Sequence, residues 1–388
     1  PHMRYAVVMA GGAGTRLWPM SRQDRPKQLL RFIQQGGKQP VSLLELAANR
    51  LDGLVEPSHR YICTAEAYRA IIREQLPAFK DDQILGEPVG RDTVNAVGFA
   101  AAVLAKEDPD AIFCVLTADH VITPDEVFRE RMDLGFRLVE NDPRRFVTFS
   151  ILPTYPATGF GYVERGTPIR DPKKGKAPGV DGVKEHAYHV ARFVEKPDLA
   201  RAQVYVESGD FAWNSGMFVW KAATILDALE RYKPESFEGL MKIQAAWGTK
   251  KAKAVLAEVY PTLPKISVDY ALMEPAAQEA KKAGKHGDAP FSVCTVQMDL
   301  TWLDVGSWPS FAETLPADKA GNRVSGEGTT HIVGGKNNLA VASKGHTVAL
   351  LGCDNMIVVQ TPDATLVMPR AKAEELKLLH AEVRDDLK

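Results

Sequence analysis

The sequence predicts an α/β domain with a mixed, mainly parallel sheet, followed by a smaller β-rich region. Strand-like apolar runs alternate with helical patterns between residues 5 and 152, as in a parallel sheet flanked by helices. Residues 111–116 are apolar throughout, which is typical of a strand buried on both faces. After about residue 312, short β segments separated by turn signals replace the helical patterns. We therefore expect one domain over residues 3–312 and a second over residues 313–388.

Composition favours a soluble globular protein with reduced thiols. The chain has 388 residues, of which 45% are hydrophobic and 25% charged, so it can bury more than one core. A net charge of −1 argues against a nucleic-acid binder that depends on bulk positive charge. The four cysteines lie far apart, and neither a bilayer-spanning run nor a signal peptide is recognisable. These features predict a cytoplasmic protein.

Periodicity and cap signals place the elements of the first domain. A strand is expected over residues 5–9, and Ser42 with Glu45 has the spacing of a capping box that opens a helix over 42–52. Strands then follow at 61–63, 84–85, 111–116 and 146–152, with helices at 65–75, after 93 and at 124–140. The middle region predicts an edge strand after 158–166, an exposed excursion over 170–185, strands at 190–194 and 291–296, and helices over 198–208 and 222–285, interrupted at 213–220.

The tail is predicted to be a small β-solenoid or a sandwich, two alternatives that the sequence leaves open. Its β segments are too short to be stable alone and should pack on the first domain. A last helix from residue 371 to about 383 carries an apolar stripe of Leu376, Leu379 and Val383. This stripe could pack on the domain or on a second subunit, and it motivates the expectation of a homodimer.

The stretch after the first strand has the composition of a phosphate-binding turn. Gly11, Gly12 and Gly14 leave backbone N–H groups free to approach a polyanion. Arg16 offers a fork of donors to phosphate oxygens, and Lys27 adds a second positive charge. The alternative is a tight turn with solvated cations. The stretch lacks the third glycine of a dinucleotide fingerprint and the Gly-Lys-Ser/Thr of a P-loop.

Two acidic residues are placed to bind a divalent cation. Asp119 follows the buried strand, and ligands of α/β proteins bind beyond the carboxyl ends of such strands. Asp304 stands near a glycine in an aromatic setting, and Mg²⁺ needs only one or two carboxylates besides phosphate oxygens and water. A turn or cap role is the alternative for Asp119. For His120 a structural role is expected, with a hydrogen bond to a metal ligand as the alternative.

Polar residues in the middle region could contact a sugar phosphate. Glu195 can accept from sugar hydroxyls, Lys196 can pair with a phosphate, and Asn214 can hydrogen-bond a polyol. The alternative for Glu195 and Lys196 is ordinary surface charge, and the alternative for Asn214 is a polar turn. Cations for a triphosphate, acids for a metal and polar loops for a sugar together predict phosphoryl-type transfer without a covalent protein nucleophile.

The glycine-rich stretch resembles the signature of sugar-phosphate nucleotidylyltransferases. Within that group it is most similar to the signature of mannose-1-phosphate guanylyltransferases. The residues that carry the resemblance are Gly11-Gly12-Ala13-Gly14-Thr15-Arg16-Leu17-Trp18-Pro19-Met20-Ser21-Arg22 with Pro26-Lys27-Gln28. The other family blocks follow in order: Glu87-Pro88 with Arg91-Asp92-Thr93, Ala118-Asp119-His120, Thr158-Gly159-Phe160-Gly161-Tyr162, Phe193-Val194-Glu195-Lys196-Pro197, Trp213-Asn214-Ser215-Gly216-Met217-Phe218 and Asp304-Val305-Gly306-Ser307-Trp308. Their joint order is specific, although single blocks are not.

The resemblance implies an open, Rossmann-like nucleotide-binding fold, a left-handed β-helix-like tail, and a reaction in which GTP and α-D-mannose 1-phosphate give GDP-mannose and diphosphate with Mg²⁺. It assigns the catalytic roles to Arg16 on the leaving phosphates, Lys27 at the α-phosphate and Asp119, which with Asp304 would bind the metal. It assigns the nucleotide pocket to Ala10, Gly11, Gly12, Gly14, Thr15, Glu87, Arg91, Asp92 and Thr93. It assigns the sugar phosphate to Gly161, Glu195, Lys196 and Asn214.

One departure from the family pattern and three alternatives remain. The family usually has asparagine where this chain has Asp92, and an ionised aspartate cannot donate a hydrogen bond, which puts the base contact in question. Another sugar or base is an alternative within the enzyme class. A catalytically silent nucleotide-sugar sensor is an alternative outside it, and an inert structural protein explains the gathered charges least well. No long isomerase domain follows in this sequence, so a second, isomerase activity is not expected.

Overall fold

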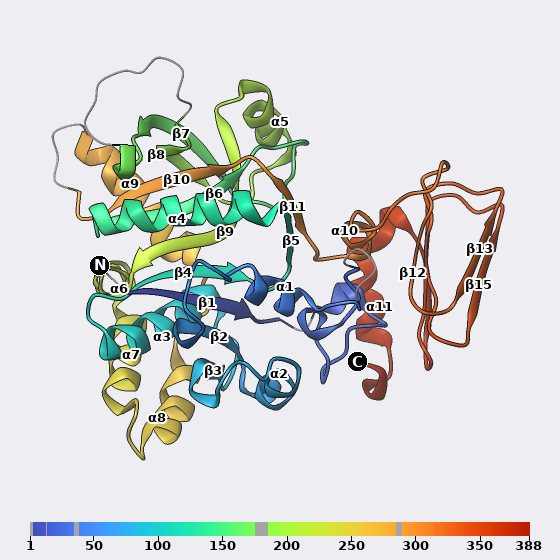
Figure 1. Cartoon of the computed structure of the whole chain (residues 1–388), viewed down its shortest axis with the longest axis horizontal. Coiled ribbons are helices and arrows are strands. Elements are labelled where there is room, and N and C mark those ends of the chain that lie inside the picture. The colour runs from blue at the N-terminus through green and yellow to red at the C-terminus, as the bar shows by residue number, and fades with distance from the viewer. Residues whose placement is uncertain (1–2, 13, 35–38, 175–184, 285–288) are drawn as a thin grey trace. The chain divides into compact units, whose positions relative to one another are not determined.

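The computed structural model describes residues 3–12, 14–34, 39–174, 185–284 and 289–388 (Figure 1). The chain forms two compact units. Unit 1 comprises residues 1–9, 50–117 and 123–300, and unit 2 comprises residues 10–49, 118–122 and 301–388. Most of the excursion predicted at 170–185 lies outside the described residues.

Unit 1 is built on a nine-stranded sheet with the order β3-β2-β1-β4-β9-β6-β10-β8-β7. Its strands are β1 (Arg4–Ala10), β2 (Arg60–Ala65), β3 (Ile84–Glu87), β4 (Ile112–Thr117), β6 (Arg145–Ile151), β7 (Tyr162–Ile169), β8 (Ala187–Val194), β9 (Phe211–Lys221) and β10 (Ser292–Met298). Strand β4 is buried as predicted, and it pairs in parallel with β1.

The sheet is mixed, but the prediction that it is mainly parallel is wrong. The pairs β3–β2, β1–β4 and β6–β10 are parallel. The pairs β4–β9, β6–β9, β7–β9, β10–β8 and β7–β8 are antiparallel. The cause is β9, which occupies the segment that sequence reasoning treated as an interruption between helices. This long strand lies between β4 and β6 and reverses the local direction of the sheet.

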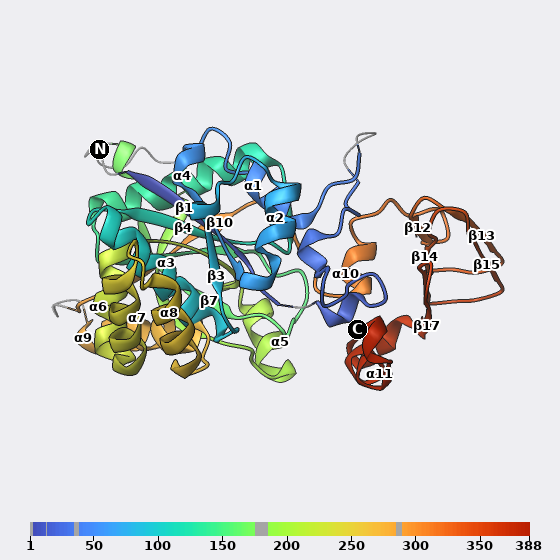
Figure 2. The ribbon, with the colours of Figure 1, turned by 90° about the horizontal axis from the view of Figure 1, so that it is seen from below.

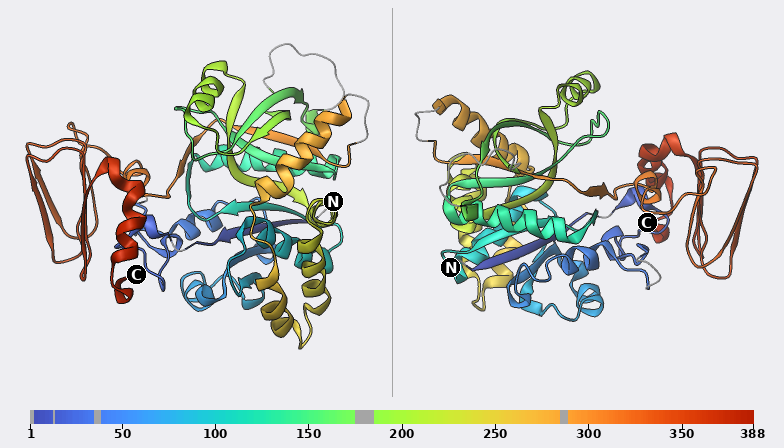
Figure 3. Two further views of the ribbon diagram at one scale, coloured as in Figure 1. Left: turned by 180° about the vertical axis from the view of Figure 1, so that it is seen from behind. Right: turned by 45° about the horizontal axis from the view of Figure 1, so that its top comes forward.

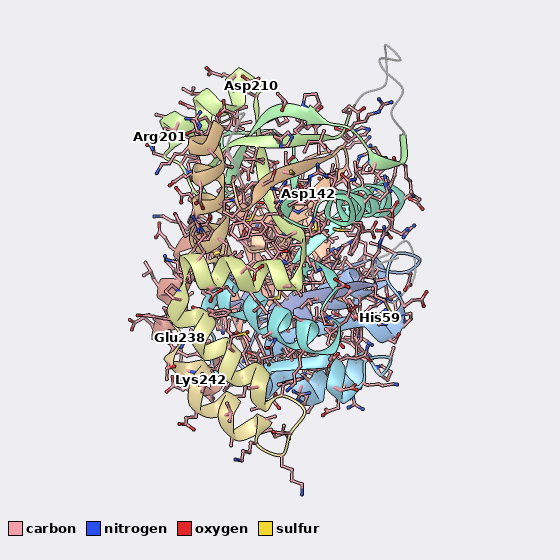
Figure 4. All side chains as sticks on the ribbon, turned by 90° about the vertical axis from the view of Figure 1, so that its left-hand side faces the viewer. His59, Asp142, Arg201, Asp210, Glu238 and Lys242 are labelled. Atoms are coloured by element: carbon pink, nitrogen blue, oxygen red, sulfur yellow. The ribbon has the colours of Figure 1, made fainter. Side chains whose placement is uncertain are left out.

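Helices cover both faces of this sheet. Helix α4 (Asp125–Asn141) packs on one face, where a Cβ on Gly135 would lie 2.6 Å from the Phe149 ring. Phe218 and Trp220 point to the opposite face because side chains alternate along β9, and they share a core with α3 (Asp92–Glu107), α6 (Ala222–Tyr232) and α7 (Pro234–Ala246). Helices α6, α7 and α8 (Ala252–Val259) gather in Figure 2. The exposed side of α7 carries Glu238 and Lys242, labelled in Figure 4.

The remaining helices of unit 1 are α2 (Arg69–Gln75), α5 (Leu199–Ser208) and α9 (Glu274–Ala283). The side chain of Asp198 caps α5 by accepting from the Arg201 N–H, and Gly209 ends the helix in the left-handed conformation. The predicted helical region 222–285 is helical but segmented, and a π-helical turn, Asp269–Met273, precedes α9. Cys63, Cys114 and Cys294 are buried in the sheet, and all four cysteines are free.

In unit 2, the predicted capping box opens α1 (Leu43–Asn49). The Glu45 N–H donates to Ser42 Oγ at 3.1 Å, and the Ser42 N–H donates to Glu45 Oε2 at 2.7 Å, so this expectation is confirmed. A two-stranded ribbon joins β5 (His120–Thr123) to β11 (Thr301–Asp304), and α10 (Trp308–Ala312) follows. Trp308 and Phe311 are buried against Leu339 and Ile357 of the tail.

The tail coils as a solenoid rather than a sandwich. Its strands are β12 (Arg323–Ser325), β13 (Thr329–Val333), β14 (Leu339–Val341), β15 (Thr347–Leu351), β16 (Met356–Gln360) and β17 (Thr365–Pro369). Parallel partners lie one coil apart: residue 323 faces 339, 339 faces 357, and 329 faces 347. Figure 3 shows these coils side by side. Strand β17 then pairs antiparallel to β16 and ends the stack.

The end of the chain is less regular than predicted. A 3₁₀ segment covers Arg370–Glu375, and only Leu376–Glu382 forms helix α11. Leu376 is buried in the core of unit 2, whereas Leu379 is 47% exposed, so the predicted stripe does not lie on one surface. Among the described residues, no helix is long and apolar enough to cross a membrane.

Candidate active site

The glycine-rich turn of unit 2 brings Lys27 next to the backbone. Gly12 and Gly14 adopt φ values of +86° and +67°, which other residues rarely adopt. Gly14 is also required by space, because a Cβ there would lie 2.7 Å from both Cβ and Cγ of Lys27. Absence of a side chain at position 14 therefore lets the lysine stem cross the turn.

Two side chains hold the carbonyl groups of this turn. The buried Gln28 amide donates to Ala10 O at 3.0 Å and to Gly12 O at 3.3 Å, and Ser21 Oγ donates to Gly14 O at 2.7 Å. The carbonyls are thereby engaged within the protein. N–H groups in such a turn are the part of the backbone that can receive an anion.

Lys27, Asp119, His120 and Asp304 form a compact group, which we call the Asp304 cluster. Lys27 Nζ donates to Asp119 Oδ2 at 3.1 Å and to Val305 O at 3.2 Å. Ligand atoms of Asp119, His120 and Asp304 all lie within 4.8 Å of one another. The ribbon of β5 and β11 creates this proximity, because it places residues 119 and 304 side by side, with the Val305 N–H donating to Asp119 O at 2.8 Å. Unit 2 thus brings together both predicted acids and Lys27.

The electrostatics of the cluster suit a divalent cation. Burial, and next the negative charge of Asp119, raise the pKa of Asp304 to about 6, while Lys27 and Arg16 act in the opposite direction. Two carboxylates that repel each other gain from a cation placed between them. His120 is buried against Trp302, and its Nε2 lies 3.5 Å from Asp119 Oδ1. Its ring can therefore orient the Asp119 carboxylate, as partners of metal ligands do.

Arg16 reaches the cluster from the turn and is paired with a residue of the tail. A Cβ on Gly306 would lie 3.2 Å from Arg16 Nη2, so the lack of a side chain at this glycine leaves the space that the guanidinium occupies. Arg16 Nη1 donates to both carboxylate oxygens of Glu374, at 3.2 and 3.1 Å. The side chain of Arg16 is 45% exposed, so its ion pair with Glu374 is weak. The guanidinium can therefore leave Glu374 and donate to another oxyanion.

A second group of predicted residues comes together in unit 1, and we call it the Asn214 cluster. Asn214 lies in β9, where the register with β6 shifts and Gly216 adopts φ +72°. Thr148 Oγ donates to Asn214 Oδ1 at 2.6 Å, and Asn214 Nδ2 donates to Asp269 Oδ1 at 2.9 Å. The side chain of Asn214 on β9 is therefore held by hydrogen bonds to β6 and to the π-helical turn.

Gly161, Glu195 and Lys196 complete the Asn214 cluster. A Cβ on Gly161 would lie 2.5 Å from Glu195 Oε2 and 3.4 Å from Asn214 Cβ. The Glu195 side chain is only 8% exposed, whereas that of Lys196 is 58% exposed, and Lys196 Nζ lies 3.1 Å from Glu195 Oε1. Lys196 also adopts φ +45°, an uncommon conformation that tends to occur at functional sites.

The block at the start of α3 is anchored to the segment that leads to Asp269. Tyr260 Oη donates to the buried Glu87 at 2.6 Å, and the Val268 N–H donates to Thr93 Oγ at 2.8 Å. Arg91 donates to Pro261 O. Asp92 is exposed and adopts φ +62°, a conformation that aspartate and asparagine tolerate best, and its carboxylate accepts the Thr93 N–H at 2.7 Å. Aspartate in place of asparagine therefore fits this turn.

Sequence reasoning missed Asp269 and Glu374. Asp269 stands in an apolar helical region between Val268 and Tyr270, and only the π-helical turn directs it to Asn214. Glu374 lies in the segment predicted to be the last helix, of which only the apolar stripe was interpreted. Neither residue follows a predicted strand, which was the signal used to find the others.

Asp269 gives the first testable expectation. Burial, and next the charge of Glu195, raise the pKa of Asp269 from an ordinary 3.8 to about 7, and the hydrogen bond from Asn214 lowers it. From about pH 4 to pH 7 the folded state retains a proton that the unfolded state releases, so rising pH costs the folded state up to about 4 kcal/mol through this group. Asp269→Asn cannot ionise and should gain stability relative to wild type over that range. Urea unfolding at several pH values measures the difference, and a pH-independent difference contradicts it.

Known proteins resemble the chain over almost its whole length. The family model described as nucleotidyl transferase matches residues 5–321, and the model for the MannoseP isomerase/GMP-like beta-helix domain matches residues 330–381. A Klebsiella pneumoniae protein named mannose-1-phosphate guanylyltransferase is 36% identical over 378 residues, which are 97% of this chain and 73% of that protein. The chain belongs to the mannose-1-phosphate guanylyltransferase family.

Other members of the mannose-1-phosphate guanylyltransferase family agree with this placement. The protein of that name from Escherichia coli strain K12 is 35% identical over 387 residues, covering 98% of this chain and 74% of the relative. A crystal structure from Thermus thermophilus, described as a mannose-1-phosphate geranyltransferase, superposes with a TM-score of 0.79 at 32% identity and covers 98% of both chains. The solenoid of the tail is thus the β-helix domain of this guanylyltransferase family.

Proposed function

We propose that this protein is a nucleotidyltransferase that converts GTP and α-D-mannose 1-phosphate to GDP-mannose and diphosphate. The observation that supports it most is the Asp304 cluster beside the glycine turn, because it combines a cation, two acids and backbone donors at one place. A phosphate oxygen of mannose 1-phosphate attacks the α-phosphorus in line. The bond from that phosphorus to the β-phosphate oxygen breaks, and diphosphate leaves.

The residues of unit 2 would act by position and charge. N–H groups of the turn formed by Ala10, Gly11, Gly12, Gly14 and Thr15 would hold the triphosphate. Arg16 would exchange Glu374 for the leaving phosphates, and Lys27 would stabilise charge at the α-phosphate. Asp119 and Asp304 would hold Mg²⁺, which when bound would screen the negative charge of the phosphates. No general base is needed, because a phosphate oxygen is already nucleophilic.

The residues of unit 1 would bind the two organic groups. Glu87, Arg91, Asp92 and Thr93 would line the nucleotide pocket. Gly161 would let Glu195 and Asn214 lie close together at the sugar, and Lys196 would pair with its phosphate. Lys196 is exposed, which suits a residue that pairs with the charged phosphate of the sugar. Glu195 is buried, which suits a residue that accepts hydrogen bonds from the sugar hydroxyls.

A substrate matrix tests the reaction. Diphosphate release should be fastest with GTP and mannose 1-phosphate, and slower with other nucleoside triphosphates or glucose 1-phosphate, because discrimination depends on buried polar contacts. A higher kcat/KM with another pair of nucleoside triphosphate and sugar phosphate would show that the enzyme uses a different base or sugar. Binding of GDP-mannose with no diphosphate release from any pair would favour the nucleotide-sugar sensor.

We further propose that residues 3–312 form the catalytic domain, that residues 313–388 form its β-rich partner, and that the protein acts in the cytoplasm. We also propose a homodimer, because Leu378 and Leu379 of α11 are 62% and 47% exposed. Light scattering should therefore give twice the chain mass of 42.6 kDa. A monomer mass contradicts the dimer.

A further inference from the structure

We propose that Asp269 is a positioning residue of the sugar subsite, and that it fixes the Asn214 amide so that this asparagine meets the sugar only as a hydrogen-bond donor. The proposal rests on the proposed function, because it assumes that Asn214 contacts the sugar. Asparagine can both donate and accept, so the orientation of its amide decides which sugar oxygens it can recognise.

The hydrogen bonds of Asn214 can be counted atom by atom. Its Oδ1 accepts from Thr148 Oγ at 2.6 Å and from the Gly216 N–H at 3.3 Å, which engages both lone pairs. Its Nδ2 carries two hydrogens, one of which is donated to Asp269 Oδ1 at 2.9 Å. Within the described part of the chain, a single N–H of the amide therefore remains for a ligand.

Asp269 determines this orientation once the pH exceeds its pKa of about 7, because the ionised carboxylate attracts the amide NH₂ and repels the amide oxygen. A flipped amide would face Asp269 with its oxygen and Thr148 with its nitrogen. The Thr148 hydroxyl can accept from that nitrogen and donate to Met217 O at 3.2 Å, so it does not select the orientation. The Gly216 N–H, which donates to Asn214 Oδ1 at 3.3 Å, would face a second donor after a flip. Asp269 is itself fixed, since the preceding Val268 N–H donates to Thr93 Oγ and Asp269 begins the π-helical turn.

The subsite is therefore asymmetric. Gly161 lies against both side chains, since a Cβ there would lie 2.5 Å from Glu195 Oε2 and 3.4 Å from Asn214 Cβ. Asn214 offers the subsite one N–H, and Glu195 offers acceptor oxygens. A sugar hydroxyl that faces Asn214 acts as an acceptor, while a hydroxyl that faces Glu195 donates. Fluorine accepts weakly and cannot donate, so a fluoro sugar can replace the first hydroxyl and not the second.

The test compares Asp269→Leu with Asp269→Asn. Leucine removes the acceptor, and the KM for mannose 1-phosphate should rise about 10- to 100-fold while the KM for GTP changes less than about threefold. Asparagine retains an acceptor oxygen at this position and should restore the KM to within about threefold of wild type. Asp227→Leu, at an exposed position of α6, is the matched control and should leave both constants unchanged. Wild-type KM in Asp269→Leu, or an equal rise in both constants, overturns the proposal.

Deoxy and fluoro analogues of mannose 1-phosphate give a second readout that does not require the leucine variant to fold. In wild type, one position should tolerate fluorine better than deletion of the hydroxyl by about tenfold in kcat/KM. This preference should persist in Thr148→Val, because Asp269 and the Gly216 N–H still hold the amide, and its loss in that variant would contradict the role of Asp269. Equal losses for fluoro and deoxy analogues at every position overturn the proposal. Absence of any reaction with mannose 1-phosphate in wild type would instead refute the proposed function.

Discussion

Replacing Asp304 by asparagine is expected to lower kcat about a thousandfold, or about 4 kcal/mol. Asp304 is half-buried and lies with Asp119 and His120 in a group whose ligand atoms are within 4.8 Å of one another. An amide oxygen carries no net charge and binds a hard cation more weakly than a carboxylate does. Initial rates of diphosphate release over a range of magnesium concentrations measure the effect, and half-activation should move to higher magnesium.

Glu327→Gln is the matched control, because Glu327 is an exposed acid of unit 2 whose charge is removed in the same way. It should retain the wild-type rate. Chelation of divalent cations should abolish the activity of wild type and control alike. Wild-type kcat in Asp304→Asn at the usual magnesium concentration would remove Asp304 from the proposed metal site.

Lys27→Ala is expected to reduce kcat by two to three orders of magnitude, about 3–4 kcal/mol. The lysine side chain is only 12% exposed and its Nζ lies 3.1 Å from Asp119 Oδ2, so its charge acts at short range in a place with little water. Its loss removes a cation from the reacting phosphate and leaves Asp119 without this ion pair. Single-turnover measurements at saturating GTP isolate the chemical step.

Lys344→Ala controls for the loss of one positive charge, since Lys344 is exposed on the tail of the same unit. It should behave as wild type. If Lys27→Ala changes only the KM for GTP, the lysine binds the nucleotide but does not stabilise the reacting phosphate. Unchanged turnover would likewise contradict that stabilising role.

Local signals predicted much of unit 2 and the beginning of the sheet. The capping box of Ser42 and Glu45 needs only residues three apart, and the glycine turn needs only its own backbone, so both could be inferred from sequence. The buried strand β4 was recognisable because six apolar residues in succession leave few alternatives. Prediction succeeded where the determining interactions are close along the chain.

Strand direction depends on long-range pairing, and here prediction failed. Strand β9 contains Asn214, Ser215 and Gly216, a polar sequence typical of turns, yet it pairs with β4, β6 and β7. The irregular register tolerates the polar residues, and the hydrogen bonds of Asn214 are satisfied by Thr148 and Asp269. A partner such as Asp269, 55 residues away, has no signature in the local sequence.

The contact between Gly14 and Lys27 links the evolution of two positions. The nearest atom to a Cβ at residue 14 would be Cβ of residue 27, at 2.7 Å, and every amino acid except glycine has that atom. Shortening the lysine therefore makes no room for alanine at position 14. The cost of Gly14→Ala should therefore be the same with lysine or with alanine at position 27, and a lineage that keeps any side chain at 27 is confined to glycine at 14.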